Sequence, residues 1–329
     1  MTQKILVIGS NSFSGASFVA YALARGAEVV GTSRSEQPTQ ALLPYRWAPH
    51  GEFSFRRVDL NHDLDALMRV VDDFRPQWVV NFAAQSMVAE SWKHPEHWFA
   101  TNAVATVRLH ERLRHCDFMD KYVHVSTPEV YGSCSGFVHE DAPFNPSTPY
   151  AVSRAAADMS LRTFHAAYDF PVVTTRAANV YGPGQQLYRI VPRAILFALI
   201  GRKLQLHGGG HSQRAFIHMR DVSDATWRIA ADGIPGQTYH ISTDEVIAIQ
   251  ELVERIYTRL GIAFRDAAEV VGERLGKDAA YMLDSTKLKR ELGWKAEISL
   301  DEGIDQCIAW VKANLAELRS QPYDYQHKP

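Results

Sequence analysis

Residues 5–15 read ILVIGSNSFSG, a short apolar run followed at once by a turn rich in glycine and serine. Residues 5–8 have the length and the branched side chains of a buried strand, and residues 16–24 have the composition of a helix that ends at Gly26. A strand, a tight glycine turn and a helix in this order are typical of the first unit of a parallel α/β sheet. The opening of the chain therefore predicts a doubly wound α/β fold.

The same alternation of strands and helices continues through the first half of the chain. The run at 78–83 is apolar, as a parallel strand buried on both faces requires. The predicted strands after the first are 28–32, 55–60, 78–83, 121–126 and 172–176, and the predicted helices between them are 63–74, 96–116 and 151–168. This order predicts a doubly wound parallel Rossmann-type sheet with helices on both faces.

The second half of the chain is broken into shorter pieces by glycine and proline. Two helices are predicted there, 249–260 and 300–318, and the second begins with a capping box that pairs Ser299 with Glu302. We place the domain boundary after residue 178, so that 179–329 form a smaller C-terminal lobe. Residues 215–245 are the segment that we regard as able to return to the sheet.

Composition limits the classes of function. The chain has 329 residues, of which 46% are hydrophobic and 22% charged, and its 35 basic and 37 acidic side chains leave a formal net charge of −2. This balance gives no attraction to nucleic acid. No apolar run has the length of a membrane span, so we expect no membrane partner. The three cysteines, Cys116, Cys134 and Cys307, lie far apart, which fits a reducing compartment. We therefore expect a cytoplasmic enzyme.

The glycine turn predicts a dinucleotide site. Gly9 permits a tight turn and Gly15 lets the helix pack close to the sheet, while the first amides of the helix face the pyrophosphate. The middle position of the usual glycine pattern is Ser12, whose Cβ narrows the approach and whose hydroxyl offers a hydrogen bond. The alternative is a plain turn that needs small residues. The predicted cofactor contacts in the turn are Gly9, Asn11, Ser12, Phe13, Ser14 and Gly15.

The end of the second strand indicates which dinucleotide binds. An acidic residue there would bind the ribose 2′-hydroxyl of NAD, but the first acid is Glu36. Ser33 and Arg34 suit a 2′-phosphate instead, which favours NADP over NAD. The alternative is that Arg34 is a solvated side chain.

Two motifs carry the catalytic chemistry. Tyr150 and Arg154 lie four residues apart on one face of a predicted helix. Thr127 and Glu129 follow a predicted strand, so they lie at the carboxyl edge of the sheet. These motifs resemble the extended short-chain dehydrogenase/reductases, specifically the nucleotide-sugar 4,6-dehydratases of the dTDP-glucose and GDP-mannose types. Further stretches carry the resemblance, namely NFAAQS at 81–86, NVYGPG at 179–184, RAFIH at 214–218 with RDV at 220–222, and ERLGKD at 273–278 with Tyr281.

The resemblance implies a ligand set for each lobe. It implies that residues 1–178 bind NAD(P) and that residues 179–329 mainly bind a nucleotide-diphosphate sugar. It also implies a homodimer that pairs the helices at 96–116 and 151–168. The further cofactor contacts are Asp59, Leu60, Ala83, Ala84 and Gln85, with Tyr150 and Arg154, and the substrate contacts are Ser86, Thr127, Asn179, Arg214 and Arg274.

The resemblance also implies a reaction in which the cofactor is recycled. Tyr150 removes the proton of the sugar 4-hydroxyl while hydride leaves C4, and Thr127 hydrogen-bonds the 4-oxygen. Glu129 then takes the C5 proton as water departs from C6, and hydride returns to C6. A positive charge about 4 Å from the phenol, at an effective dielectric constant near 20, is worth roughly 4 kcal/mol. That is about three pKa units, enough to help a phenol act as a base.

Two positions depart from the pattern of the family. Arg154 stands where the family has lysine, which keeps the charge but changes how a ribose would be held. Pro128 stands where dTDP-glucose dehydratases have an acid, and proline donates no proton. Glu129 would then serve as both base and acid. The alternatives that these departures leave open are a 4-epimerase, a UDP-glucuronate decarboxylase and a non-catalytic nucleotide-sugar binder.

Several other residues are expected to have structural or surface roles rather than functional ones. His94 and His97 flank Pro95 without a convincing third ligand, as do His207 and His211 around a glycine loop, so we expect no metal. The aromatic residues Trp92, Trp98 and Phe99 are expected in the core, with the border of the sugar pocket as the alternative. Arg189 and Arg193 are expected on a solvated helix face.

Overall fold

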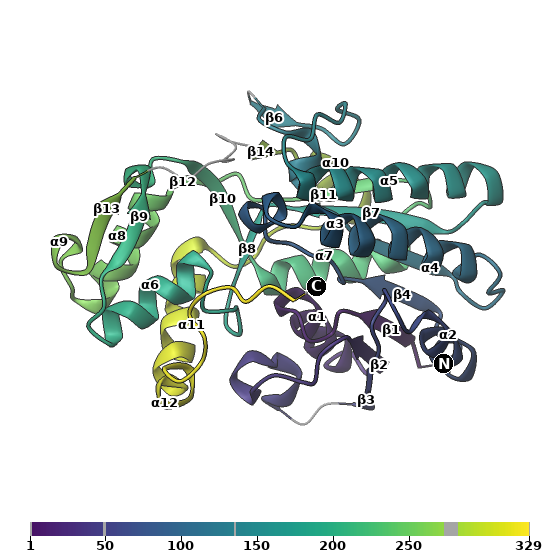
Figure 1. The fold of residues 1–329 in the computed structure, drawn as a ribbon, viewed down its shortest axis with the longest axis horizontal. Helices are drawn as coiled ribbons and strands as arrows, with labels where there is room; N and C mark the ends of the chain where they lie inside the picture. Colours follow the sequence, from purple (N-terminus) through teal and green to yellow (C-terminus); the bar gives the residue numbers. More distant parts are fainter. Residues whose placement is uncertain (1, 49–50, 135, 273–281, 329) are drawn as a thin grey trace.

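The computed structural model describes residues 2–48, 51–134, 136–272 and 282–328. Its largest element is a seven-stranded sheet in the order β11-β7-β5-β4-β1-β2-β3, in which every neighbouring pair is parallel (Figure 1). The predicted doubly wound Rossmann-type fold is therefore confirmed. The strands are β1 (Lys4–Ile8), β2 (Glu28–Ser33), β3 (Phe53–Arg57), β4 (Trp78–Asn81), β5 (Lys121–Val125), β7 (Val172–Ala177) and β11 (Thr238–Ile241).

The period of two in the first strand divides the hydrophobic core between the faces of the sheet. Ile5 and Val7 belong to a cluster that includes residues of α1 and α7, whereas Leu6 and Ile8 belong to a cluster with α2, α4 and α5. All four side chains are almost fully buried. The helices on these faces are α1 (Phe13–Leu23), α7 (Met219–Asp232), α2 (Leu64–Phe74), α4 (Thr106–Leu113) and α5 (Pro149–Tyr168).

A smaller lobe with its own core lies beside the sheet (Figure 1). Its strands form a three-stranded sheet, β12-β10-β8, and a pair, β13-β9. Residues 215–245 are shared, because β10 belongs to this lobe and β11 to the large sheet; the boundary at 178 stays a prediction. The remaining strands are β6 (Phe137–Val138), β8 (Asn179–Tyr181), β9 (Leu204–His207), β10 (Gln213–His218), β12 (Val246–Ala248), β13 (Ala268–Val271) and β14 (Met282–Leu283). The remaining helices of this half are α6 (Ile190–Leu199), α8 (Ile249–Leu260), α9 (Phe264–Ala267), α10 (Thr286–Leu292), α11 (Leu300–Ala313) and α12 (Leu315–Leu318).

The predicted helix at 96–116 is wrong in one respect, because it is not continuous. It is divided into α3 (Pro95–Trp98), a π-helical segment (Phe99–Ala105) and α4. The buried Asn102 explains the segment: its Oδ1 accepts from the backbone of Gln85 at 2.8 Å, and its Nδ2 donates to the carbonyl of Gln85 at 3.0 Å. A π-helical turn thus lets one amide fix the end of β4.

Two other boundaries also differ from the sequence prediction. The third strand ends at Arg57 rather than at residue 60, and the last helix is interrupted at Asn314, whose side chain donates to the carbonyl of Trp310 at 2.8 Å. The cap predicted at Ser299 is present, since its Oγ accepts from the amide of Glu302 at 3.2 Å. Short 3₁₀ turns lie at Gln40–Leu42, Pro44–Arg46, Ala89–Trp92, Pro128–Tyr131 and Gly208–Gly210.

Among the described residues, no helix has both the length and the apolar character that crossing a bilayer requires.

Candidate active site

The turn between β1 and α1 is packed too closely for any residue but glycine at two positions. Gly9 has φ of +86°, and a Cβ there would lie 2.7 Å from the amide nitrogen of Ala83. A Cβ on Gly15 would lie 2.2 Å from the carbonyl oxygen of Gly9. The N-terminus of α1 is thus held against the carboxyl edge of β1, which lies between β2 and β4. We call the strip of the sheet edge between the ends of β2 and β4 the dinucleotide groove, and the free amides of α1 lie along it.

Ser12 serves this turn rather than reaching outward. Its Oγ accepts from the amide of Gly15 at 3.1 Å and donates to the carbonyl of Gly9 at 2.7 Å. The sequence predicts that this hydroxyl could donate a hydrogen bond to a phosphate. In the structure it caps the N-terminus of α1 instead. Phe13 is buried, while Asn11 and Ser14 lie partly exposed beside it.

The end of β2 forms one rim of the groove. The Oγ of Ser33 accepts from the amide of Asn11 at 3.0 Å, which ties the rim to the glycine turn. Arg34 donates to the carbonyl of Lys328 at 3.1 Å, and Glu36 pairs with Arg57 at 3.3 Å. The rim therefore presents a hydroxyl and a guanidinium, and the carboxylate of Glu36 is held by Arg57.

The end of β4 forms the opposite rim. Asn81 accepts from the amide of Ala83 at 2.9 Å, and Ala84 and Gln85 continue the rim. Gln85 is buried, and its Nε2 donates to the carbonyl of Lys328 at 2.7 Å. Ser86, assigned to the substrate from the sequence, is exposed. Two other predicted cofactor contacts follow β3: Asp59 accepts from the amide of Asn61 at 2.8 Å, and Leu60 is buried.

Tyr150 lies in the first turn of α5, where Thr148 caps the helix by accepting from the amide of Ala151 at 3.2 Å. The phenol is 7% exposed and hydrogen-bonds with Thr127. Burial, with the nearby carboxylate of Glu129, raises the pKa of Tyr150 to about 12 against the lowering effect of Arg154 and Arg189. The structure thus brings together Tyr150, Thr127 and Glu129, as the sequence predicts.

The short 3₁₀ turn Pro128–Tyr131 orients two of these groups. Thr127 precedes the turn, and its Oγ1 accepts from the amide of Glu129 at 3.4 Å. Pro128 occupies the first position of the turn, where a missing amide hydrogen costs nothing. The structural reason for Pro128 is therefore the turn itself.

Arg154 lies one helical turn after Tyr150 and is 2% exposed. Its guanidinium donates to the carbonyl of Val125 and lies 3.3 Å from His124 Nε2. His124 lies 3.2 Å from the carboxylate of Asp158, which also accepts from Arg176 at 2.7 Å. These buried charges hold the pKa of Asp158 well below its ordinary value despite burial, and burial lowers the pKa of His124. The orientation of the Arg154 side chain is thus fixed by a buried network of polar residues.

The residues assigned to the substrate from the sequence are only partly gathered. Asn179 donates to the carbonyl of Ala215 at 3.3 Å, next to Arg214 on the paired strand β10. Arg274 lies outside the described residues, together with the whole ERLGKD stretch at 273–278 and Tyr281.

Arg189, for which the sequence favoured a solvated helix face, lies near Tyr150. It immediately precedes α6 and lies close enough to Tyr150 to lower the pKa of that phenol, so its expected place on a solvated face is wrong. Arg193 is likewise engaged, donating to the carbonyl of Tyr323 at 2.7 Å. The only available signal was their position after the NVYGPG stretch.

Comparison with known proteins identifies the family. The family model described as GDP-mannose 4,6 dehydratase matches residues 6–307. The chain belongs to this family. A probable dTDP-glucose 4,6-dehydratase of Sinorhizobium fredii is 32% identical over 95% of this chain and 93% of its own length.

Solved structures agree with this assignment. The dTDP-glucose 4,6-dehydratase of Bacillus anthracis in complex with NAD has a TM-score of 0.88 and 30% identity, over 97% of this chain and 99% of its own. MoeE5 in complex with UDP-glucose and NAD has a TM-score of 0.84 and 28% identity, over 95% and 99%. The prediction of a nucleotide-sugar 4,6-dehydratase of the extended short-chain dehydrogenase/reductase type, which uses a nicotinamide cofactor, is confirmed at the level of family and reaction class.

Proposed function

We propose that the chain converts a nucleoside-diphosphate hexose to its 4-keto-6-deoxy derivative with four residues in defined roles. Tyr150 removes the proton of the 4-hydroxyl, and Thr127 holds the 4-oxygen. Glu129 takes the proton from C5 and returns a proton to the departing 6-hydroxyl. The observation that supports these roles is the convergence of Tyr150, Thr127 and Glu129 at the carboxyl edge of the sheet.

The chain fits a nicotinamide dinucleotide along this edge. Gly9 and Gly15 leave room that a Cβ would fill, and the Nε of the buried Arg154 has no hydrogen-bond partner within the described part of the chain. That N–H is placed to donate to a ligand such as a ribose hydroxyl. The bound cofactor would supply the chemistry of accepting hydride from the sugar and returning it.

The charge of Tyr150 must change during the reaction. Burial raises the pKa of this phenol to about 12, which is too high for a base at neutral pH. Arg154 and Arg189 lower the pKa, and positive charge brought by a ligand would add to their effect. Binding of cofactor would therefore activate Tyr150.

The test of Glu129 is its replacement by glutamine, which keeps the shape and removes the base. Turnover should fall by about 10²–10⁴ while nucleotide binding persists. Glu251→Gln, on the exposed face of α8, is the matched control and should keep full activity. Full activity of Glu129→Gln would refute the assigned role.

The products distinguish the reaction from its alternatives. A panel of nucleotide sugars, followed by mass spectrometry in deuterated water, should show loss of one water with deuterium at C5. Inversion at C4 without loss of mass would mean an epimerase, and loss of carbon dioxide a decarboxylase. Tight binding without turnover would mean a non-catalytic binder. The panel also identifies the nucleobase, since the family model names GDP-mannose and the relative dTDP-glucose.

For the cofactor, we propose that Ser33 and Arg34 admit NADP as well as NAD. Both side chains lie at the end of β2, and Glu36, the nearest acid, pairs with Arg57. The solved neighbours contain NAD. Arg34→Ala should weaken NADP binding much more than NAD binding; an equal loss would refute a contact with the 2′-phosphate.

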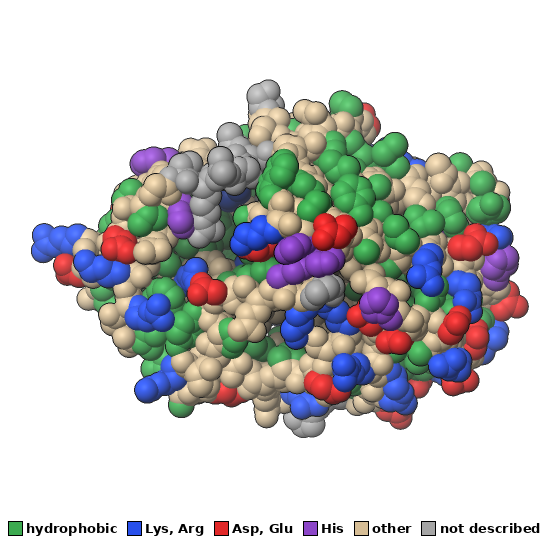
Figure 2. All heavy atoms as spheres, in the orientation of Figure 1, with side chains coloured by type: hydrophobic (Ala, Val, Ile, Leu, Met, Phe, Trp, Pro, Cys, Tyr) green, Lys and Arg blue, Asp and Glu red, His purple; other side chains and the backbone are tan. Residues whose placement is uncertain are grey.

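We also propose a homodimer through the segment 96–116 with the preceding turn Ala89–Trp92, and through α5. Exposed apolar side chains gather on these elements, and hydrophobic atoms cover this part of the face in Figure 2. The exposed side chains are Trp92, Phe99, Val104, Val152 and Met159. This surface fits a second copy of the chain. Met159→Glu should convert a dimer to a monomer in sedimentation experiments; a monomeric wild type would refute the proposal.

A further inference from the structure

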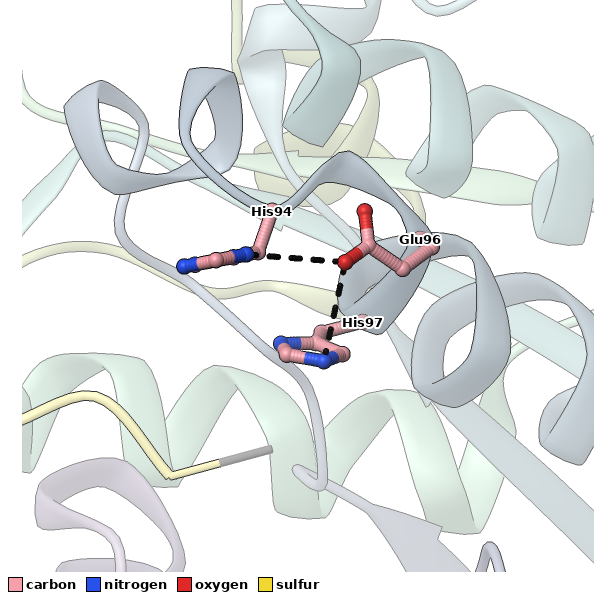
Figure 3. Close-up of side chains that lie close together, drawn as sticks. All are labelled: His94, Glu96 and His97. Carbon is pink, nitrogen blue, oxygen red and sulfur yellow. Dashed lines mark ion pairs between the residues drawn. The ribbon is translucent and has the colours of Figure 1, made fainter.

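Three potential metal ligands meet at the start of α3. The Nδ1 of His94 lies 3.5 Å from Oε1 of Glu96, and the Nε2 of His97 lies 3.7 Å from the same oxygen (Figure 3). All three ligand atoms lie within 4.8 Å of one another. The third ligand that the sequence did not reveal is thus the residue between the two histidines, because the turn at Pro95 brings its carboxylate back toward both rings.

The spacing is close to that of a tetrahedral metal site. Zinc binds imidazole nitrogen and carboxylate oxygen at about 2.0–2.2 Å, which places neighbouring ligand atoms about 3.4 Å apart. Two of the three separations here are 3.5 and 3.7 Å, so small side-chain rotations would complete the geometry. The cluster is open to solvent, since 57%, 65% and 27% of the side chains of His94, Glu96 and His97 are exposed. An ion therefore has a path to the site.

The second ring nitrogen of His97 forms a hydrogen bond with His327, a residue near the C-terminus. Its Nδ1 lies 2.8 Å from Nε2 of His327, and the two ring planes are 18° apart. A hydrogen bond at this distance needs one ring to donate and the other to accept, and His97 can donate from Nδ1 to Nε2 of His327. With the proton on Nδ1, the lone pair of His97 Nε2 faces Glu96. Metal-binding histidines commonly donate their other N–H in this way.

His327 belongs to a C-terminal tail, Tyr323–Lys328, that lies across the dinucleotide groove. Figure 1 shows this segment running from α12 back to the middle of the molecule. The ring of His327 stacks on Trp98 with centroids 4.9 Å apart, and the hydroxyl of Tyr325 donates to Gln85 at 3.3 Å. The carbonyl of Lys328 accepts from Gln85 and Arg34, one residue from each rim. Since β1 lies between β4 and β2, this carbonyl lies over the groove.

We propose that His94, Glu96 and His97 bind a divalent transition-metal ion of the zinc class, and that the ion fastens the tail across the groove through His327. The two imidazoles and one carboxylate are a donor set that suits zinc, nickel and cobalt. A fastened tail should slow the exchange of a dinucleotide bound beneath it. This effect on exchange rests on the proposed function, whereas the ion site rests on its own geometry. An ion on Nε2 strengthens the N–H donor at Nδ1, and so strengthens the bond to His327.

The first experiment tests the ion site. Chelator-treated wild type is titrated with Zn²⁺ by calorimetry and with Co²⁺ by visible absorption, and one ion per chain with the spectrum of tetrahedral cobalt is expected. His97→Ala should weaken binding at least about tenfold, since the loss even of a residue that only supports a metal ligand typically costs about 10–100-fold. His115→Ala is the matched control, because His115 and Glu111 form a single histidine–carboxylate pair at 3.6 Å. Equal affinity of wild type and His97→Ala would overturn the ion site.

The second experiment tests the coupling to the tail. Chymotrypsin cleavage after Tyr323 or Tyr325 should slow when Zn²⁺ is present, by at most the ratio of the affinities of the ion for the docked-tail and released-tail states. His327→Ala should bind the ion and lose this protection. NADH release, followed by fluorescence, should slow with Zn²⁺ in wild type alone. Ion binding without protection would overturn the coupling and leave the ion site standing. The ion and tail measurements do not need turnover, so a failure of the proposed reaction is recognised separately.

Discussion

The molecule contains two groups of histidines whose surroundings are opposite. His110, His124 and His240 lie beneath the catalytic helix and are fully buried, whereas His94 and His97 lie at the surface of α3. Burial lowers the pKa of each of the three inner rings, for His240 to about 3. These rings stay neutral at physiological pH and serve as fixed hydrogen-bond partners. The surface pair lies where an ion from solvent can reach it.

The role of a histidine in this protein therefore depends more on how deeply its ring is buried than on the residues next to it in the sequence. His240 illustrates the inner role: its Nδ1 donates to the carbonyl of Val138 at 3.1 Å, and its Nε2 accepts from Tyr131 at 2.8 Å. Both ring nitrogens are committed to one tautomer. At the surface, the same side chain keeps a nitrogen directed at a carboxylate and accessible to solvent.

The largest expected effect follows from removing the one carboxylate in the inner network. Asp158→Asn would leave the buried Arg176 and Arg154 without their negative partner, and should lower the free energy of unfolding by about 3–5 kcal/mol. Urea denaturation measures it. Asp65→Asn breaks the exposed pair with Arg112 and should hardly move the urea midpoint. Equal losses would contradict the contrast between buried and exposed groups.

The next effect concerns the charge behind Tyr150. Arg154→Met should lower turnover at neutral pH by about 10³, since a charge about 4 Å away is worth roughly 4 kcal/mol at an effective dielectric constant of 20. Arg154→Lys keeps the charge and should remain within about tenfold of wild type. The pH–rate profile is the readout, because loss of the charge should raise the pKa of the phenol and so move the acidic limb, on which the rate rises with pH, to higher pH. An unmoved profile in Arg154→Met would show that Arg154 does not tune the phenol.

A smaller effect is expected from pH alone. The folded-state pKa of His240 is about 3 and the ordinary value is 6.5, so the unfolded chain binds the proton first. Stability contributed by this ring is complete above pH 6.5 and falls by about 1.4 kcal/mol per pH unit below it. Between pH 6.5 and 5 the loss is about 2 kcal/mol, before carboxylates titrate. His240→Asn should flatten this slope in urea titrations, and an unchanged slope would count against the buried neutral ring.

The smallest effect is expected at the surface. Without metal, His94→Ala should change the free energy of unfolding by less than about 0.5 kcal/mol, because this side chain is 57% exposed. With saturating Zn²⁺ the wild type should gain stability by mass action and the variant should not. Thermal unfolding with and without chelator measures the difference. A large loss in the chelated protein would show that the exposed cluster is structural.

The sequence predicted those parts of the fold and site that depend on short-range pattern. The turn of Gly9 and Gly15 and the spacing of Tyr150 and Arg154 are local features, and both lie where the pattern places them. The role of Ser12 as a helix cap was not predicted, because one hydroxyl can serve either a phosphate or its own turn.

The missed features depend on contacts between distant segments. Nothing near Asn102 in the sequence indicates that its amide binds Gln85, and this contact accompanies the interruption of a predicted helix. The charge of Arg189 acts on Tyr150 although the two residues are 39 positions apart in the sequence. The tail joins Lys328 to Gln85 across 243 positions. Such contacts follow from the complete packing of the chain, which periodicity does not encode.

The return of β11 to the large sheet has a consequence for exchanging lobes between relatives. β11 covers the edge of β7, and α7 fills the same core as α1. A fragment ending at residue 178 would expose that edge and a face of the core, and should aggregate. A chimaera that changes substrate preference must therefore keep 219–241 with its parent sheet and graft the segments on either side. Segments of the smaller lobe thus alternate with segments of the large sheet along the chain, so exchanging one end of the chain does not exchange the lobe.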